Sequence, residues 1–140
     1  MDPRARGTTA YCPLATIGGT TEEEAGAPGE GRAEEEAARP AAASSRLALL
    51  SWRDVATRHA VQSRALAEAV LSAIELRGLG PTRLRERLPY TFLGVNAPGI
   101  LLECGTLTSA ADRQRVSSPE GLKALAATIA EGVDAYRRNE

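Results

Sequence analysis

The fold is decided by residues 96–109, Asn96-Ala97-Pro98-Gly99-Ile100-Leu101-Leu102-Glu103-Cys104-Gly105-Thr106-Leu107-Thr108-Ser109. An apolar run lies between two turn signals here, which is the pattern of a short buried strand. The run ends on one carboxylate, Glu103. Ligands and catalytic groups gather at the carboxyl ends of parallel strands, where the turns open into a crevice. We therefore hypothesise that Glu103 is a functional residue at a strand end. The alternative is a structural carboxylate that caps the next turn or pairs with a nearby arginine.

Segments upstream of this stretch have the patterns of one strand and one helix. Residues 7–14 are rich in β-branched and aromatic residues and predict a strand, which Pro13 ends or confines to an edge. From about Leu49 to Arg77, apolar residues recur with helical spacing and predict one long amphipathic helix. Residues 82–88 are typical of a basic connector, and Tyr90–Leu93 are typical of a short strand or extended segment.

Two helix starts follow the stretch. Ser109 and Asp112 have the spacing of a capping box, and Ser118-Pro119 repeats the start signal with proline at the first helical position. The last helix should cover one face of the sheet with the stripe Leu122, Leu125, Ala126, Ile129, Val133 and Tyr136. Strands mixed with helices in this order predict an α/β fold.

Charge divides the chain unevenly. Residues 1–45 hold four arginines and eight acidic residues, although the whole chain has a net charge of only −1. Residues 18–45 contain scarcely any large apolar residue, so we expect a disordered acidic insertion whose glutamate runs are solvated. The near-zero net charge argues against a nucleic-acid binder, which normally carries a basic excess.

The lengths of the apolar runs, the two cysteines and the single histidine argue against a membrane span, a disulfide framework and a histidine ligand, respectively. No apolar run approaches the roughly 18 residues that span a bilayer, and residues 1–6 lack the apolar core of a secretion signal. Cys12 and Cys104 form no paired motif, so free thiols are expected, with a bridge between them as the alternative. His59 is the only histidine, and we expect it to be a packing residue rather than a ligand.

Six segments occur together in an order that a known family shares. They are Arg6-Gly7 through Tyr11, Ser63-Arg64-Ala65-Leu66-Ala67, Arg77-Gly78, Pro89 to Leu93, Ala97-Pro98-Gly99-Ile100-Leu101-Leu102-Glu103-Cys104-Gly105, and Leu125-Ala126 through Gly132 to Tyr136. By these segments the chain resembles the zinc-dependent N-acetylmuramoyl-L-alanine amidases, which are cell-wall hydrolases of the amidase-3 type. The resemblance covers nearly all of the chain except residues 18–45. Thr106 and Ser109 depart from the family, which usually has Phe and Asn at these positions.

The resemblance implies a fold, a substrate and a site. The fold would be part of a three-layer αβα domain, with a mixed or parallel sheet, helices on both faces and N-terminal strands missing. Residues 1–17 would supply one strand, residues 18–45 the insertion, and residues 46–140 the C-terminal part of the catalytic domain. Glu103 would be the catalytic glutamate, acting as base on a zinc-bound water and then as acid toward the leaving amine. The partner would be bacterial peptidoglycan, in the periplasm or outside the cell.

The zinc ligands are the part of the family pattern that this chain does not match. The family binds zinc through two histidines and a glutamate in segments upstream of the matched region, so we expect this chain to supply the base without a metal site. We therefore expect a C-terminal fragment with weak or no activity alone. The alternatives are a non-catalytic wall-binding or regulatory remnant, or a small interaction module whose helix at 49–77 packs on a partner.

Overall fold

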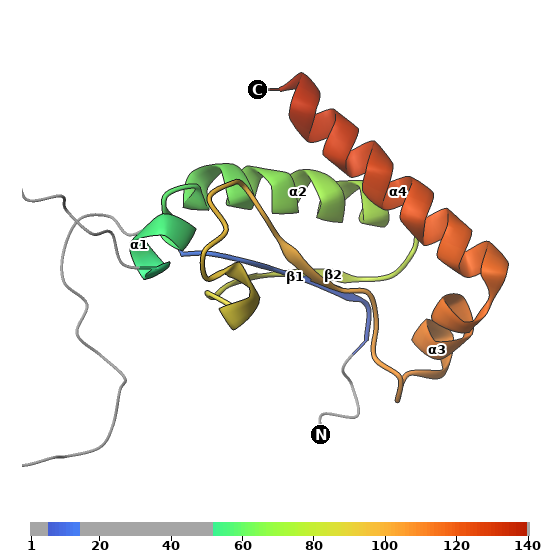
Figure 1. Cartoon of the computed structure of the whole chain (residues 1–140). Coiled ribbons are helices and arrows are strands. Elements are labelled where there is room, and N and C mark those ends of the chain that lie inside the picture. The colour runs from blue at the N-terminus through green and yellow to red at the C-terminus, as the bar shows by residue number, and fades with distance from the viewer. Residues whose placement is uncertain (1–5, 15–51, 140) are drawn as a thin grey trace, which may run out of the picture. The chain divides into compact units, whose positions relative to one another are not determined.

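The computed structural model describes residues 6–14 and 52–139, which belong to one structural unit (Figure 1). The predicted insertion at 18–45 lies outside the described residues. Within them the fold is a mixed α/β arrangement of a three-stranded sheet and four α-helices, as the sequence predicts.

The sheet has the strand order β2-β1-β3. Its strands are β1 (Thr8–Cys12), β2 (Thr82–Glu86) and β3 (Leu101–Glu103). β2 runs parallel to the central strand β1, and β3 runs antiparallel to it. The predicted strands at 7–14 and within 96–109 are therefore confirmed, and the sheet is mixed.

Residues 82–88 contain a strand, so the predicted basic connector is wrong. Within the strand itself, Thr82–Glu86, the single apolar residue Leu84 is too little to reveal a strand face by alternation. Leu84 packs against the buried cluster of Ala10, Ala67 and Leu71, while its neighbours in β2 point away from that cluster. The hydrogen bonds to β1, rather than the intrinsic pattern of β2, determine that this segment is extended.

The predicted helix at 49–77 is two helices in its described part, α1 (Trp52–Thr57) and α2 (Ala60–Leu76). The Thr57 hydroxyl donates to the carbonyl oxygen of Arg53 at 3.0 Å, which competes with regular helix hydrogen bonding at the break. The backbone N–H of Arg58 bonds to the oxygen of Val55, only three residues back. The backbone thus forms a tight turn at residues 57–59 before α2 begins.

The predicted strand at 90–93 is also wrong, because Tyr90–Phe92 form a 3₁₀ turn, η1. Pro89 starts it, and its oxygen accepts from the N–H of Phe92 at 2.9 Å. The Phe92 ring then lies against Gly99, where an added Cβ would come within 3.0 Å of the ring. This turn fixes the approach of the chain to β3.

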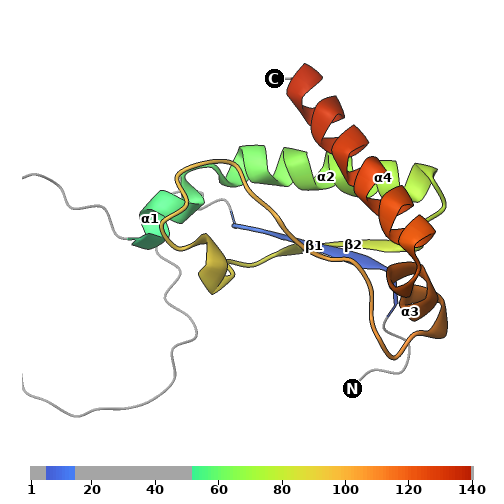
Figure 2. The same cartoon turned by 45° about the vertical axis from the view of Figure 1, so that its right-hand side comes forward.

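The core lies between the sheet and two helices. α2 runs along one face of the sheet, and α4 (Pro119–Arg138) crosses α2 in both views (Figures 1 and 2). Val70 and Ile74 of α2 and Leu125 of α4 form a buried cluster with Leu102 of β3 beside them. Within the predicted stripe of α4, Leu125 is buried but Leu122 is 50% exposed, because the packed face is centred on Leu125, Thr128 and Gly132.

Gly132 allows α4 to approach α2 closely. A Cβ at Gly132 would lie 2.6 Å from the Cα of Val70, which is backbone and cannot move aside. We expect Gly132→Ala to lower the free energy of unfolding by about 2 kcal/mol, although alanine favours a helix by about 1 kcal/mol elsewhere. Urea unfolding measures the change. Ala130→Ser, at an exposed position of the same helix, is the control. An unchanged or raised stability of Gly132→Ala would contradict this packing.

Candidate functional site

Glu103 is the last residue of β3 and lies opposite Thr9 of β1. The predicted position at a strand end is confirmed, but the strand direction behind the prediction is wrong. Because β3 is antiparallel to β1, its carboxyl end meets the amino end of β1. Glu103 therefore lies beside the start of the parallel pair, away from the carboxyl ends of those strands.

A hollow of about 200 Å³ surrounds Glu103 on the face of the sheet opposite α2. The registers of the strands explain which residues line this hollow. Arg83, Thr9 and Glu103 form one row across the three strands, and Arg85, Tyr11 and Leu101 form the next. The hollow is lined by Arg6, Gly7, Thr9, Tyr11, Arg83, Arg85, Glu103, Gly105 and Thr106.

Tyr11 holds the carboxylate of Glu103. Its hydroxyl donates to Oε2 of Glu103 at 3.0 Å. Burial, and then the hydrogen bond to Glu103, raise the pKa of Tyr11 above its ordinary value, so the phenol stays protonated and remains a donor. Oε1 of Glu103 has no hydrogen-bond partner within residues 6–14 and 52–139. In this part of the chain Glu103 neither caps a turn nor pairs with an arginine, which leaves one oxygen open to the hollow.

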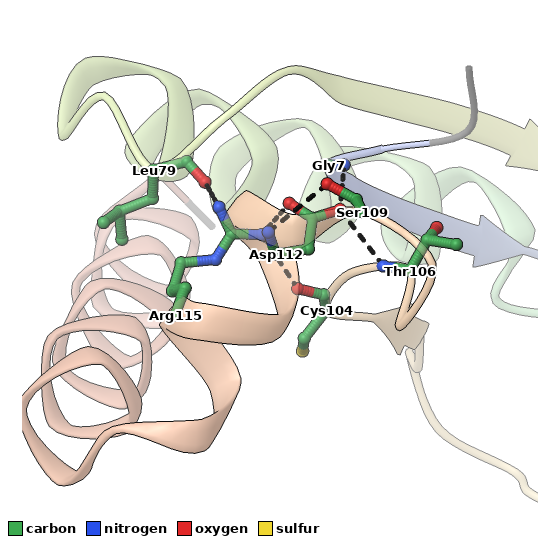
Figure 3. A network of polar contacts seen from close by, with 7 residues as sticks. All are labelled: Gly7, Leu79, Cys104, Thr106, Ser109, Asp112 and Arg115. Carbon is green, nitrogen blue, oxygen red and sulfur yellow. Dashed lines mark hydrogen bonds and ion pairs between the residues drawn. The ribbon is translucent and has the colours of Figure 1, made fainter. Parts of the chain in front are cut away.

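The loop that follows Glu103 is fastened by the carboxylate of Asp112, near the start of α3 (Ala110–Ser117) (Figure 3). Oδ2 accepts from the backbone N–H of Gly7 at 2.8 Å and from that of Thr106 at 3.1 Å. Oδ1 accepts from Nη2 of Arg115 at 2.8 Å. Asp112 is only 3% exposed, so these contacts satisfy a buried charge.

Arg115 extends this network to two further segments. Its Nη2 also donates to the carbonyl oxygen of Cys104 at 3.2 Å, and Nη1 donates to that of Leu79 (Figure 3). The loop after β3, the turn before β2 and the start of β1 are thereby held together. No local signal singled out Arg115, because only Asp112 among its partners is near in the chain, while Cys104 and Leu79 are distant from it.

The capping box at Ser109 is only half present. The Ser109 hydroxyl accepts from the N–H of Asp112 at 3.3 Å, as predicted. The Asp112 side chain, however, turns to Gly7 and Thr106 instead of the Ser109 N–H. Although burial raises the pKa of Asp112, the hydrogen bonds from Gly7 and Thr106 and the Arg115 charge hold this pKa below its ordinary value.

Gly7 and Gly105 allow the backbone to lie close to Pro81 and to the Asp112 side chain, respectively. Gly7 has φ +85°, and a Cβ there would lie 2.0 Å from the oxygen of Pro81. Gly105 has φ +153°, and a Cβ there would lie 3.0 Å from the Cβ of Asp112. Any side chain at either position would displace the Asp112 carboxylate or its donors.

The other candidate residues lie outside the hollow. His59 shares a hydrogen bond of 3.2 Å with Asn96, between Nε2 and Oδ1. Cys12 and Cys104 are free thiols, as predicted, and burial raises the pKa of both. The raised pKa values favour the protonated form of both thiols at neutral pH, which is not the nucleophilic form.

The lining of the hollow does not fit a zinc ion. Zinc sites use three or four ligands drawn from His, Cys, Asp and Glu, whereas this hollow offers one carboxylate among three arginines. Across residues 6–14 and 52–139 no group of three such side chains is close enough to hold a metal ion. The zinc that the resemblance predicts stays unconfirmed.

The chain matches the model of a known protein family. The family described as N-acetylmuramoyl-L-alanine amidase matches residues 2–135. No curated protein and no solved structure matches the chain. In the described part of the chain, no helix has the length and apolar character needed to cross a membrane.

The Asp112 network should make stability depend on pH. A carboxyl group whose pKa is lowered in the folded state stabilises the fold above its unfolded pKa of about 4, and this stabilisation is lost as pH falls through the folded pKa. We expect Asp112→Asn to lower the free energy of unfolding by about 3 kcal/mol at neutral pH and by much less near pH 2. Urea unfolding at both pH values measures the difference.

Asp134→Asn is the matched control, because Asp134 is 61% exposed and lies 4.0 Å from Arg137. It should change stability by less than about 0.5 kcal/mol at either pH. An equal loss for Asp112→Asn at neutral and acid pH would show that its charge is not the stabilising feature.

Proposed function

The chain belongs to the N-acetylmuramoyl-L-alanine amidase family, and on this premise we propose that it hydrolyses the amide bond between the N-acetylmuramoyl group and L-alanine in peptidoglycan. The family acts on the cell wall, so the site of action would be the periplasm or the exterior of a bacterial cell. The observation that carries the proposal for this chain is the carboxylate of Glu103, exposed in a polar hollow with one oxygen held and the other open.

Glu103 would act as general base and then as general acid. Its Oε1 would accept a proton from the water that attacks the amide carbonyl, while the water oxygen forms a bond to the carbonyl carbon. The same proton would pass to the nitrogen of alanine as the carbon–nitrogen bond breaks, which gives a free carboxylic acid and a free amine. The hydrogen bond from Tyr11 would keep the carboxylate in one orientation through both transfers.

The rate from this chain alone should be low. General acid–base catalysis supplies about 10²–10⁴ in rate, which is small for amide hydrolysis. In the family, zinc activates water and polarises the carbonyl, and the described residues around Glu103 offer no such ligand set. We therefore propose a catalytic portion whose activity is weak unless residues outside the described ones complete the site.

A second candidate function is binding to the wall without hydrolysis. The observation that favours it is the hollow itself, where three arginines and one glutamate present a net positive charge. A protein with this surface could bind an anionic wall polymer and leave it intact.

The hydrolase proposal is tested with N-acetylmuramoyl-L-alanine as substrate, by measuring the release of free L-alanine with zinc supplied. We expect a low rate that Glu103→Gln reduces by about 10²-fold or more, because glutamine cannot accept the proton. Glu120→Gln, an exposed carboxylate in the first turn of α4, is the control and should keep the rate. Release that is absent in the unmodified chain or unchanged in Glu103→Gln would contradict the proposal, and co-sedimentation with intact peptidoglycan would then test wall binding.

Tyr11→Phe tests the positioning of Glu103. The substitution removes one hydrogen bond to a charged group and leaves the ring in place, so we expect kcat to fall about tenfold while KM is unchanged. Tyr90→Phe, at a side chain that is 90% exposed, is the matched control and should have no effect. A rise in KM with unchanged kcat would mean that Tyr11 binds substrate rather than holding the base.

A further inference from the structure

We propose that the hollow contains a carboxylate-binding subsite, formed by the guanidinium groups of Arg83 and Arg85, which takes an acidic side chain in the peptide part of the substrate. This inference rests on the proposed function, because it names what the same hollow recognises beside the bond that is cut. It assigns a role to two arginines that the catalytic step does not use.

The strand register brings both arginines to the same face as Glu103. In β2, Leu84 points into the buried cluster under α2, so its neighbours Arg83 and Arg85 point to the opposite face. They lie beside Thr9 and Tyr11 of β1. Same-face neighbours on a strand are roughly 7 Å apart, so one carboxylate can lie between the two guanidinium groups and accept from both.

The charge of these arginines is uncompensated in the described part of the chain. Neither has an ion pair with a carboxylate of residues 6–14 or 52–139, and Glu103 accepts its hydrogen bond from Tyr11 instead. On the opposite side of the sheet, by contrast, Arg64 pairs with Glu68 at 2.9 Å and Arg77 pairs with Glu131 at 2.6 Å. Arg6 also lines the hollow, which adds to its positive charge.

The distance to Glu103 sets where the acidic group lies in the substrate. Arg83 and Glu103 are on the two outer strands of the sheet, with Thr9 between them, so their backbones are roughly 10 Å apart. An extended peptide spans that distance in about three residues. The long side chains of arginine and glutamate cover part of that distance, so the acidic residue would lie within about three residues of the bond that is cut and can directly follow the alanine.

Protection of a sheet edge is the competing explanation for the arginines. β2 is an outer strand of the described sheet, and charged side chains discourage pairing with another chain. Arg87 separates the two explanations, because it follows β2 directly but does not line the hollow. Edge protection needs only positive charge, whereas bidentate recognition of a carboxylate needs the guanidinium group.

The test is a titration of the full ¹⁵N-labelled chain with N-acetyl-alanyl-glutamate and with N-acetyl-alanyl-glutamine, each with its C-terminus amidated so that only the glutamate side chain offers a carboxylate, followed by amide shifts of Thr9, Gly105 and Thr106. These peptides have the same shape and differ in one charge. We expect the glutamate peptide to bind at least tenfold more tightly. The double variant Arg83→Gln/Arg85→Gln should lose this difference, while Arg87→Gln should keep it within about twofold. Equal affinity for the two peptides, or an equal loss in Arg87→Gln, would overturn the proposal.

Two further arms complete the test. Arg83→Lys/Arg85→Lys keeps the edge charge, and therefore solubility, but should lose most of the tenfold preference; full retention would overturn the assignment to guanidinium groups. Inorganic phosphate should not displace the peptide at equal concentration, and displacement would mean a general anion site. Because the titration needs no hydrolysis, its outcome is independent of the amidase assay. A preference for glutamate without hydrolysis would support the subsite and contradict the amidase proposal. Hydrolysis that depends on Glu103, without the preference, would support the amidase proposal and contradict only the subsite.

Discussion

The described fold depends on the charge of Asp112. A carboxylate that is 3% exposed must find hydrogen-bond donors, because an unsatisfied buried charge costs several kcal/mol. Its donors come from three places in the sequence: Gly7 before β1, Thr106 after β3, and Arg115 in α3. The requirement to satisfy one side chain thus fixes the ends of two strands relative to each other. Arg115 adds the turn at Leu79, so the start of β2 is held by the same network.

This network determines where Glu103 lies without touching it. Glu103 is the last residue before the loop that Asp112 and Arg115 fasten, and Cys104, the next residue, gives its carbonyl oxygen to Arg115. Tyr11, one strand away, then fixes the carboxylate by its hydroxyl. The Asp112 carboxylate lies in the protein interior, whereas the Glu103 carboxylate lies in the open hollow. A rigid backbone next to an accessible oxygen is what an acid–base group requires.

Local patterns predicted the parts of the fold that depend on local chemistry. The strand at Thr8–Cys12, the caps at Ser109 and Ser118, and the free thiols follow from composition and from signals within a few residues. The strand β2 could not be predicted in this way, because its single inward apolar residue acquires a partner only from β1 and α2. The antiparallel direction of β3 is likewise a property of the sheet, so the end at which Glu103 lies could not follow from its sequence. Most of the hollow was missed for the same reason, since its arginines are brought beside Glu103 by register alone.

The arginines also restrict what can lie on this face of the sheet. An apolar helix packed over Arg83 and Arg85 would bury two guanidinium groups without carboxylates, and each would cost several kcal/mol. Whatever covers the face must therefore bring water or negative charge. The opposite face shows the contrast, because Ala10 and Leu84 there meet Ala67 and Leu71 with no charge to satisfy. One sheet thus has an apolar face that builds the core and a cationic face suited to an anionic ligand, and Glu103 lies on the cationic face, where such a ligand would meet it.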